Sequence, residues 1–105
     1  MTRALNFQQI QAFKAVMETG TTTRAALVLN TTQPSVSRRL SELRSATGLD
    51  LFDRFNGRLR PTREGLQLYQ SVRKHFAGLE KIESAVQILR KSGTGVLRIG
   101  ATPTL

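Results

Sequence analysis

The fold is decided by residues 32–47, TQPSVSRRLSELRSAT, which carry the signals of one helix. Thr32 is of a type that caps helix starts, and Pro34 stands in the first turn, where a missing amide hydrogen costs nothing. Gly48 follows the last turn and suits the left-handed conformation that ends many helices. Both ends are marked, so we predict one continuous helix over this stretch.

This helix has one apolar face and one polar face. Val36, Leu40 and Leu43 recur at spacings of four and three residues, which predicts a buried stripe. The opposite face carries an amide, an arginine and short hydroxyl groups but no acid: Gln33, Pro34, Ser37, Arg38, Ser41 and Ser45. Most helices of this kind are simply solvated on their polar side, so the neighbouring segments decide what this face does.

The polar face holds the residue types that recognise DNA bases. Arginine can bridge the two acceptors of guanine, and glutamine can pair with adenine. Short hydroxyl side chains let the backbone approach phosphate closely. A helix about 22 Å long also fits the floor of the major groove. We expect base choice to come from Gln33, Ser37 and Arg38, and phosphate contacts from Thr32, Ser35 and Ser41.

Composition favours a polyanionic partner. The 105 residues include 16 Lys and Arg against seven Asp and Glu, a net charge of +9, and 39% hydrophobic residues, enough for one modest domain with an appendage. Neutralised phosphates release counterions, which adds affinity without sequence choice. Ribosomal and membrane-surface proteins share this charge bias. The sequence has no cysteine, no signal-peptide core and no apolar run of membrane length, so we expect a soluble cytoplasmic protein without a cofactor or a membrane partner.

A first helix is predicted over residues 5–19. Asn6 and Gln9 have the spacing of a capping box, and Gly20 ends the helix. An apolar stripe at helical spacing is core far more often than a ligand site. We therefore assign five residues of this helix to the core: Phe7, Ile10, Phe13, Val16 and Met17.

A second, short helix is predicted over residues 22–29, with a break at Asn30 and Thr31. Ala25 and Ala26 are small enough for a close helix crossing, although alanine is also common helix filler. A short helix, a tight turn and a longer helix with a polar outer face have the form of a helix-turn-helix. Thr23, at the start of the second helix, is then a candidate for a phosphate contact.

A β-hairpin is predicted after the third helix. Two short segments, residues 52–55 and 58–60, flank Asn56-Gly57, the dipeptide that best suits a two-residue hairpin turn. Such a hairpin would be a wing beside the third helix. Three arginines lie on it and suit phosphate or the minor groove: Arg54, Arg58 and Arg60. The alternative is a charged edge that only discourages aggregation. Seven arginines against three acids between residues 33 and 63 favour DNA.

A long helix is predicted from Thr62, its cap, to Ser92. Apolar residues recur every three or four positions along about 45 Å, more than the preceding segments can bury. The stripe drifts around the helix, as it does when one part packs on its own domain and the rest on a partner helix. We predict a homodimer through this helix, although a further domain could cover the same face. The expected dimer residues are Tyr69, Val72, Phe76, Leu79, Ile82, Val86 and Leu89.

The last residues predict the start of another domain. Residues 93–95 read as a hinge, and residues 96–101, VLRIGA, as a strand without a partner strand. We therefore expect a chain cut from a longer protein. The predicted fold is mainly α, with a winged helix-turn-helix over residues 1–61, a linker and dimerisation helix over 62–92, and a hinge and first strand of a truncated domain over 93–105.

Taken together, these segments resemble the DNA-binding domain of LysR-type transcriptional regulators. The resemblance covers nearly the whole chain. It is carried by AA in the second helix, TQPSVSRRL in the third, LFDR at the wing and PTREG at the start of the linker helix, in that order and spacing. The string AFKAVMETG is most similar to the lysine-biosynthesis and opine-catabolism regulators of the family.

The resemblance implies a detailed function. Gln33, Pro34, Ser37 and Arg38 would face the major groove, and Arg54 would contact the backbone or the minor groove. It also implies an inverted-repeat promoter site in double-stranded DNA, a dimer joined by linker helices, and a full-length tetramer. The missing C-terminal domain would bind a small-molecule effector, and the AFKAVMETG string suggests that the effector is amino-acid-like.

The sequence departs from the family pattern around the second helix. Thr22 stands where an aromatic or aliphatic residue is usual, and Thr31 occupies a commonly apolar turn position. Leu27 and Val28 replace a charged pair, which predicts an exposed apolar patch. These departures affect the packing of the second helix and leave the proposed base-contacting face unchanged.

Two other classes of function fit the sequence less well. Catalysis is disfavoured, because His75 is the only histidine and no cysteine, acid cluster or phosphate-binding glycine loop accompanies it. We expect a non-enzyme. A nonspecific nucleoid-associated or RNA-binding protein remains the alternative, and it differs from a regulator in showing no affinity ratio between sequences.

Overall fold

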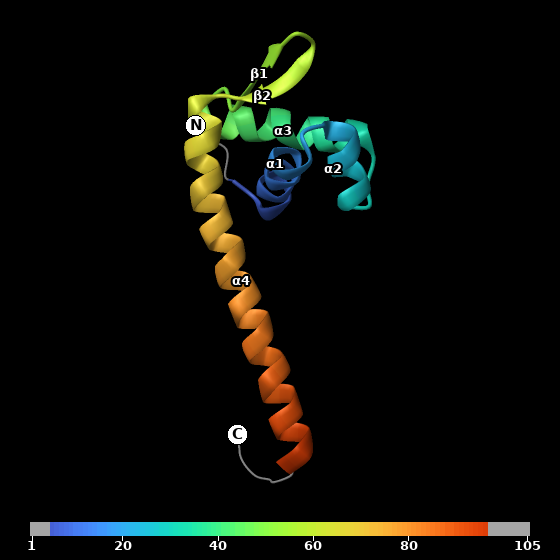
Figure 1. Ribbon diagram of the computed structural model, residues 1–105, viewed down its shortest axis with the longest axis vertical. Coiled ribbons are helices and arrows are strands. Elements are labelled where there is room, and N and C mark those ends of the chain that lie inside the picture. Colours follow the sequence, from blue (N-terminus) through green and yellow to red (C-terminus); the bar gives the residue numbers. More distant parts are fainter. Residues whose placement is uncertain (1–4, 97–105) are drawn as a thin grey trace. The chain divides into compact units, whose positions relative to one another are not determined.

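The computed structural model describes residues 5–96, which form four helices and one hairpin (Figure 1). The elements are α1 (Phe7–Thr19), α2 (Thr22–Val28), α3 (Gln33–Thr47), β1 (Phe52–Phe55), β2 (Arg58–Pro61) and α4 (Arg63–Val96). The predicted mainly α architecture, a winged helix-turn-helix followed by a long helix, is confirmed. The chain divides into two units between Arg73 and Lys74, within α4.

Local capping signals determine where the first helices begin and end. The Asn6 side chain accepts a hydrogen bond from the Gln9 amide at 2.9 Å, and the Gln9 side chain accepts one from the Asn6 amide at 3.4 Å. This is the predicted capping box, and it starts α1 two residues later than predicted because Asn6 itself is extended. Gly20 ends the helix in the left-handed region with φ 90°.

The third helix begins and ends as predicted. The Thr32 hydroxyl accepts from the Ser35 amide at 3.2 Å, and Pro34 lies in the first turn. Gly48 closes the other end with φ 70°, and its amide donates to the Arg44 carbonyl at 2.8 Å. The 15-residue helix is thus held at both ends by residues of its own sequence.

The core lies where α1, α2 and α3 pack against one another. Ala25 and Ala26 of α2 are buried, as expected at a close helix crossing, and Val36 and Leu43 of α3 are fully buried. Leu40 is partly buried and packs against this cluster, together with Phe52 and Leu59 of the hairpin. The hairpin is therefore seated on the same core as the helices.

The buried face of α1 differs from the predicted one. Phe13 and Val16 are buried, but Phe7 is 50% exposed and lies on the opposite side of the helix from the centre of the buried face. Ile10 and Met17 are partly buried at its edge. The actual centre includes small side chains and one amide, Gln9, Ala12 and Ala15. A close helix approach buries small residues that an apolar-size argument ranks too low.

The hairpin turn has the predicted chemistry. Strands β1 and β2 are antiparallel, with Phe52 opposite Pro61 and Phe55 opposite Arg58. Asn56 and Gly57 both have positive φ, 52° and 75°, which a two-residue turn of this kind requires. The second strand is one residue longer than predicted.

Thr62 joins the loop before the hairpin to the start of α4. Its hydroxyl caps the helix by accepting from the Gly65 amide at 3.1 Å, as predicted, and donates to the Asp50 carbonyl at 2.6 Å. Its amide donates to the Leu51 carbonyl at 3.0 Å. Gly65 packs directly on this loop, because a Cβ there would lie 2.2 Å from the Leu51 carbonyl oxygen. Only glycine fits this approach without a backbone shift.

The fourth helix is longer than predicted. It continues past Ser92 to Val96, through residues 93–95 that we expected to form a hinge and into the first residue of the expected strand. Two glycines each cost a helix only about 1 kcal/mol relative to alanine, and no proline interrupts this segment. The rest of the expected strand, residues 97–101, lies outside the described residues. Within residues 5–96, no helix is long and apolar enough to cross a bilayer.

Candidate nucleic-acid interface

The first two turns of α3 present the polar residues that were predicted from the sequence. Gln33, Pro34 and Arg38 are exposed and Ser37 is partly exposed, so all four side chains of the predicted base-contacting set are accessible. No acidic side chain lies between residues 33 and 41. Among the described residues, the Arg38 guanidinium has no ion-pair partner, which leaves its donors available to a ligand.

Gln33 is held in place by two hydrogen bonds. Its side-chain nitrogen donates to the Ser37 hydroxyl at 2.7 Å and to the Thr22 hydroxyl of α2 at 3.0 Å. These bonds use both amide hydrogens and leave the amide oxygen without a partner in the described part of the chain. Thr22, a departure from the family pattern, therefore positions the first residue of α3. Sequence reasoning did not assign it this role, because the contact spans 11 residues.

The other hydroxyl groups near α3 divide into two kinds. The Thr32 and Ser35 hydroxyls bond to each other at 2.9 Å while Thr32 caps the helix, so they are already partly occupied. Ser41 and Thr23 are exposed, and no side-chain hydrogen bond to either is found in residues 5–96. Thr32 and Ser35 lie at the start of α3, Ser41 lies further along it, and Thr23 lies at the start of α2.

The three wing arginines are not equivalent. Arg60 pairs with Asp53, its cross-strand partner, at 3.2 Å and lies 4.5 Å from the centre of the Phe55 ring. Arg54 donates to the Gly57 carbonyl at 3.4 Å. Arg58 has no partner among the described side chains. We predicted the same role for all three arginines. However, a two-residue turn at Asn56-Gly57 sets the register of the strands, and this register places Asp53 opposite Arg60.

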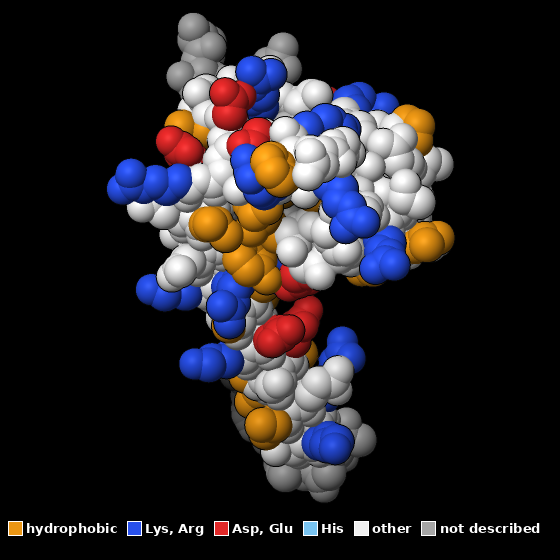
Figure 2. Space-filling model, turned by 45° about the horizontal axis from the view of Figure 1, so that its top comes forward, with side chains coloured by type: hydrophobic (Ala, Val, Ile, Leu, Met, Phe, Trp, Pro, Cys, Tyr) orange, Lys and Arg blue, Asp and Glu red, His pale blue; other side chains and the backbone are white. Residues whose placement is uncertain are grey.

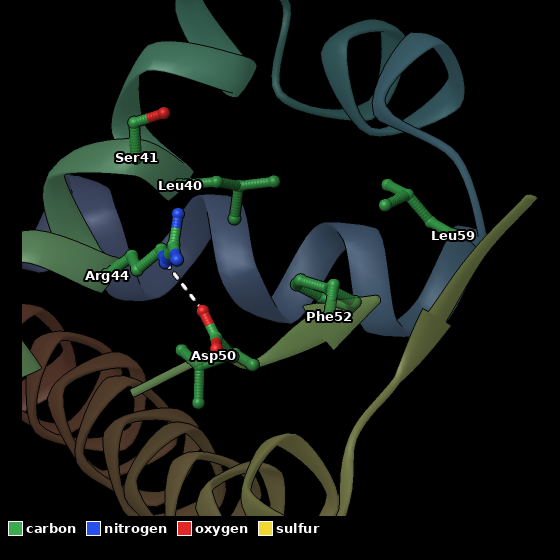
Figure 3. Close-up of a pocket in the computed structure, with 7 residues that line it drawn as sticks. Leu40, Ser41, Arg44, Asp50, Phe52 and Leu59 are labelled. Atoms are coloured by element: carbon green, nitrogen blue, oxygen red, sulfur yellow. Dashed lines mark ion pairs between the residues drawn. The ribbon is translucent and has the colours of Figure 1, made fainter. Parts of the chain in front are cut away.

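A hollow lies between the second half of α3 and the hairpin (Figure 3). It has a volume of about 320 Å³, and Leu40, Phe52 and Leu59 reach it from α3 and the two strands. Arg44 and Asp50 form an ion pair there at 2.6 Å. Both side chains are mostly exposed, so this pair contributes only about 0.2–1 kcal/mol and serves mainly to position α3 against the loop before β1.

Basic side chains are spread over the face that carries α3 and the hairpin, with several acidic side chains beside them on the left of the view (Figure 2). No group of three or more His, Cys, Asp or Glu side chains that could hold a metal ion occurs in the described residues. His75 lies on the surface of α4 with its ring edge-to-face to Phe76 at 5.6 Å. The surface is therefore suited to polyanion binding through guanidinium, amide and hydroxyl groups.

The predicted dimer stripe of α4 has two parts. Its first residues pack within the domain: the Tyr69 hydroxyl donates to Glu18 at 3.3 Å, its ring meets Phe13 edge-to-face at 6.5 Å, and Val72 is 3% exposed. Val72 is therefore buried within its own chain and is not accessible to a partner helix, and Tyr69 packs chiefly against α1 of the same chain. The later residues are accessible in one chain: Phe76 and Leu79 are partly exposed, and Ile82, Val86 and Leu89 are exposed.

The exposed apolar patch predicted on α2 is present. Leu27 is 77% exposed and Val28 is 67% exposed. Both lie in the last turn of α2, beyond Ala25 and Ala26, which carry the packing of this helix.

Comparisons with known proteins agree with this geometry. The model of bacterial regulatory helix-turn-helix proteins of the lysR family matches residues 7–66. The transcriptional activator protein LysR of Escherichia coli (strain K12) is 44% identical over 100 residues, which is 95% of this chain and 32% of that protein. The octopine catabolism/uptake operon regulatory protein OccR of Rhizobium meliloti is 39% identical over 101 residues, 96% of this chain and 34% of the relative. The chain thus spans about a third of the length of these relatives.

A solved DNA complex has the same fold. The crystal structure of the BenM DNA-binding domain with its catB site 1 DNA superposes with a TM-score of 0.75 at 27% identity, over 82% of this chain and 97% of that one. The resemblance inferred from the sequence, including its likeness to lysine and opine regulators, is confirmed by these matches.

Proposed function

Because the chain belongs to the LysR family of bacterial regulatory helix-turn-helix proteins, we propose that it is the DNA-binding module of a transcriptional regulator and selects promoter sequence through α3. The observation that carries this proposal is the accessible, acid-free first half of α3, where Gln33 is already fixed by two hydrogen bonds. A pre-positioned amide loses less side-chain entropy when it meets a base.

We assign base contacts to the predicted set. Arg38 has five donors and no competing partner in the described residues, and it would bridge the two acceptors of guanine. Gln33 would accept from adenine with its free amide oxygen and exchange one of its internal hydrogen bonds for the adenine N7 acceptor. Ser37 and Pro34, on the same exposed turn, would contact the neighbouring bases.

Phosphate contacts would come from hydroxyl groups and from the wing. Thr23 and Ser41 are accessible. The Ser35 hydroxyl accepts from Thr32 and keeps its own hydrogen to donate to a phosphate, whereas Thr32, whose hydroxyl hydrogen is used, would offer its backbone amide. Arg54 and Arg58 would provide most of the wing's charge. Arg60 would contribute less, because Asp53 already compensates it.

We further propose that two chains read an inverted repeat as a homodimer. The dimer surface would be the later part of α4, with Leu79, Ile82, Val86 and Leu89 as its centre and Phe76 at its edge. Exposed leucine, isoleucine and valine at spacings of three and four are the pattern of a helix that packs on another helix. Closed two-fold symmetry of the protein would then be matched by the two-fold symmetry of the site.

The remaining expectations concern the whole protein. We propose that residues 93–105 lead into an effector-binding domain, that the full-length regulator is a tetramer, and that an amino-acid-like molecule is its effector. The regulator would work in the cytoplasm, where promoter DNA lies, and would need neither a cofactor nor catalysis for this function. The likeness to a regulator named for octopine catabolism and uptake supports this class of effector.

Substitution of Arg38 tests base recognition. Arg38→Ala should cost about 1–3 kcal/mol on the specific site and change binding to random DNA little. Arg58→Ala removes the same charge from the wing and should instead weaken binding to all sequences. Equal losses for Arg38→Ala on the specific and the random duplex would remove Arg38 from the base contacts.

A further inference from the structure

A basic groove, separate from the hollow between α3 and the hairpin, lies beside the start of α3. It is formed by the turn between α1 and α2, by Arg24 of α2, and by the tip of the hairpin, and its volume is about 610 Å³. All of its residues belong to the first of the two units. Its lining residues are Thr19, Gly20, Thr21, Thr22, Arg24, Arg54, Gly57, Arg58 and Leu59.

The charge in this groove is uncompensated. Three arginines line it, Arg24, Arg54 and Arg58, and none of its lining residues is acidic. Arg24 and Arg58 have no ion-pair partner in the part of the chain that the structure describes. The carbonyl of Gly57 holds Arg54 at the turn of the hairpin, at 3.4 Å. Three like charges gathered without an acid raise the local positive potential and favour an anion there.

The groove is continuous with the predicted base contacts. Thr22 lines the groove and also accepts the hydrogen bond from Gln33 at 3.0 Å. An anion in the groove therefore lies one side chain away from the residue that would meet a base. In double-stranded DNA, the sugars and phosphates of the backbone lie on either side of the base edges that are exposed in the major groove. A group beside the base-contacting residue would therefore meet the DNA backbone.

We propose that this groove binds a backbone phosphate of the DNA that flanks the bases contacted by α3, and that Arg24 is one of its ligands together with Arg54 and Arg58. The inference rests on the proposed function and adds a residue to it, since Arg24 was not among the predicted contacts. Arginine binds phosphate through two parallel N–H donors, so three arginines on opposite walls can clamp one phosphodiester. The clamp would link the helix-turn-helix to the wing when DNA is bound.

The test measures the affinity of the 105-residue chain for one duplex, the sequence most enriched by wild-type selection from a random pool. Each backbone phosphate of that duplex is replaced in turn by an uncharged methylphosphonate. Wild type and Arg24→Ala are compared on the whole series, with Arg24→Lys to restore the charge and Arg73→Ala as a matched loss of arginine outside the groove. Circular dichroism checks that helix content is unchanged, as expected for the exposed Arg24.

We expect Arg24→Ala to weaken binding to the unmodified duplex about tenfold. The magnitude of the slope of log K against log salt should fall by up to about 0.9, the value for loss of one whole phosphate contact, because Arg54 and Arg58 still face that phosphate. One phosphate position in each half-site should weaken wild type when neutralised and weaken Arg24→Ala clearly less, because only Arg54 and Arg58 still face that phosphate in the variant. Arg24→Lys should recover the salt slope, and Arg73→Ala should show no such position.

Two results would overturn the proposal while the proposed function stands. In the first, wild type selects its sequence but Arg24→Ala binds the whole series with wild-type affinity and slope. In the second, inorganic phosphate displaces DNA from wild type more than chloride of equal ionic strength does, and it has no such effect on Arg24→Ala. If, in addition, no methylphosphonate position affects wild type and Arg24→Ala differently, the groove binds free phosphate and not the DNA backbone. Failure of wild type to select any sequence would instead contradict the proposed function itself.

Discussion

The contact between Gly65 and the Leu51 carbonyl predicts a large effect from one methyl group. A Cβ at position 65 would lie 2.2 Å from the Leu51 oxygen, whereas ordinary contacts begin near 3.4 Å, so the backbone must recede by about 1.2 Å. That oxygen also accepts the Thr62 amide at 3.0 Å, so the loop cannot move without straining this hydrogen bond. Overpacking of this kind costs about 1–3 kcal/mol, and a buried donor left unpaired costs about as much again.

Gly65→Ala should therefore lower the free energy of unfolding by about 1–5 kcal/mol, even after a gain of up to about 1 kcal/mol from the higher helix propensity of alanine. In a domain of this size, each kcal/mol corresponds to a shift of roughly 4–8 °C in Tm. Urea unfolding followed by circular dichroism would measure the change. Several protein concentrations are needed, because self-association would make the apparent stability depend on concentration.

Gly78→Ala is the matched control. It makes the same substitution in the same helix, but a Cβ there meets nothing within 4 Å. This variant should be more stable than wild type, by up to about 1 kcal/mol. If the two variants shift the free energy of unfolding in the same direction and by similar amounts, the close approach of α4 to the Leu51 loop is not what determines the effect.

Four substitutions test caps, charges and the dimer surface. Asn6→Ala removes the capping box and should cost about 0.5–2 kcal/mol of unfolding free energy in urea; an unchanged midpoint would argue against the cap. Arg58→Ala should lower the salt slope of DNA affinity by about 0.9, and Arg60→Ala by less because Asp53 already pairs with it; equal slopes for the two variants would refute this ranking. Leu79→Glu should shift the chain towards monomer in sedimentation velocity, and a dimer that survives the change would place the interface elsewhere.

The ends of the elements were predictable because their signals are local. Asn6 with Gln9, Thr32 with Gly48, and Asn56-Gly57 each act within a few residues, and each adopts the conformation that its residue types favour. The largest difference is at the end of α4, where no strong terminator follows Ser92 and the helix continues to Val96. Glycine alone lowers helix propensity without preventing the helix.

Features that depend on distant contacts were harder to predict. The size of Phe7 favoured burial, yet α2 and α3 approach the alanine side of α1 and leave Phe7 half exposed. Periodicity placed Val72 on the dimer stripe, but periodicity cannot say whether the same chain or a partner buries a residue.

The accessible polar end of α3 could be identified from the sequence, but its supporting contacts could not. Periodicity and residue type were sufficient to choose Gln33, Ser37 and Arg38. The bond from Gln33 to Thr22 and the approach of Arg24 to the wing bring together residues of separate elements. Such contacts follow from tertiary packing, and one sequence carries no local pattern for them.

Selection from a random pool of double-stranded DNA would show whether the chain chooses its DNA by sequence. The 105-residue chain would be mixed with the pool near physiological salt, and the bound fraction would be sequenced. The proposed function predicts enrichment of an inverted repeat whose half-sites lie about one helical turn apart or a multiple of that distance, as for other dimeric helix-turn-helix proteins. Retention of DNA without enrichment of any sequence would contradict it and favour nonspecific binding through charge alone.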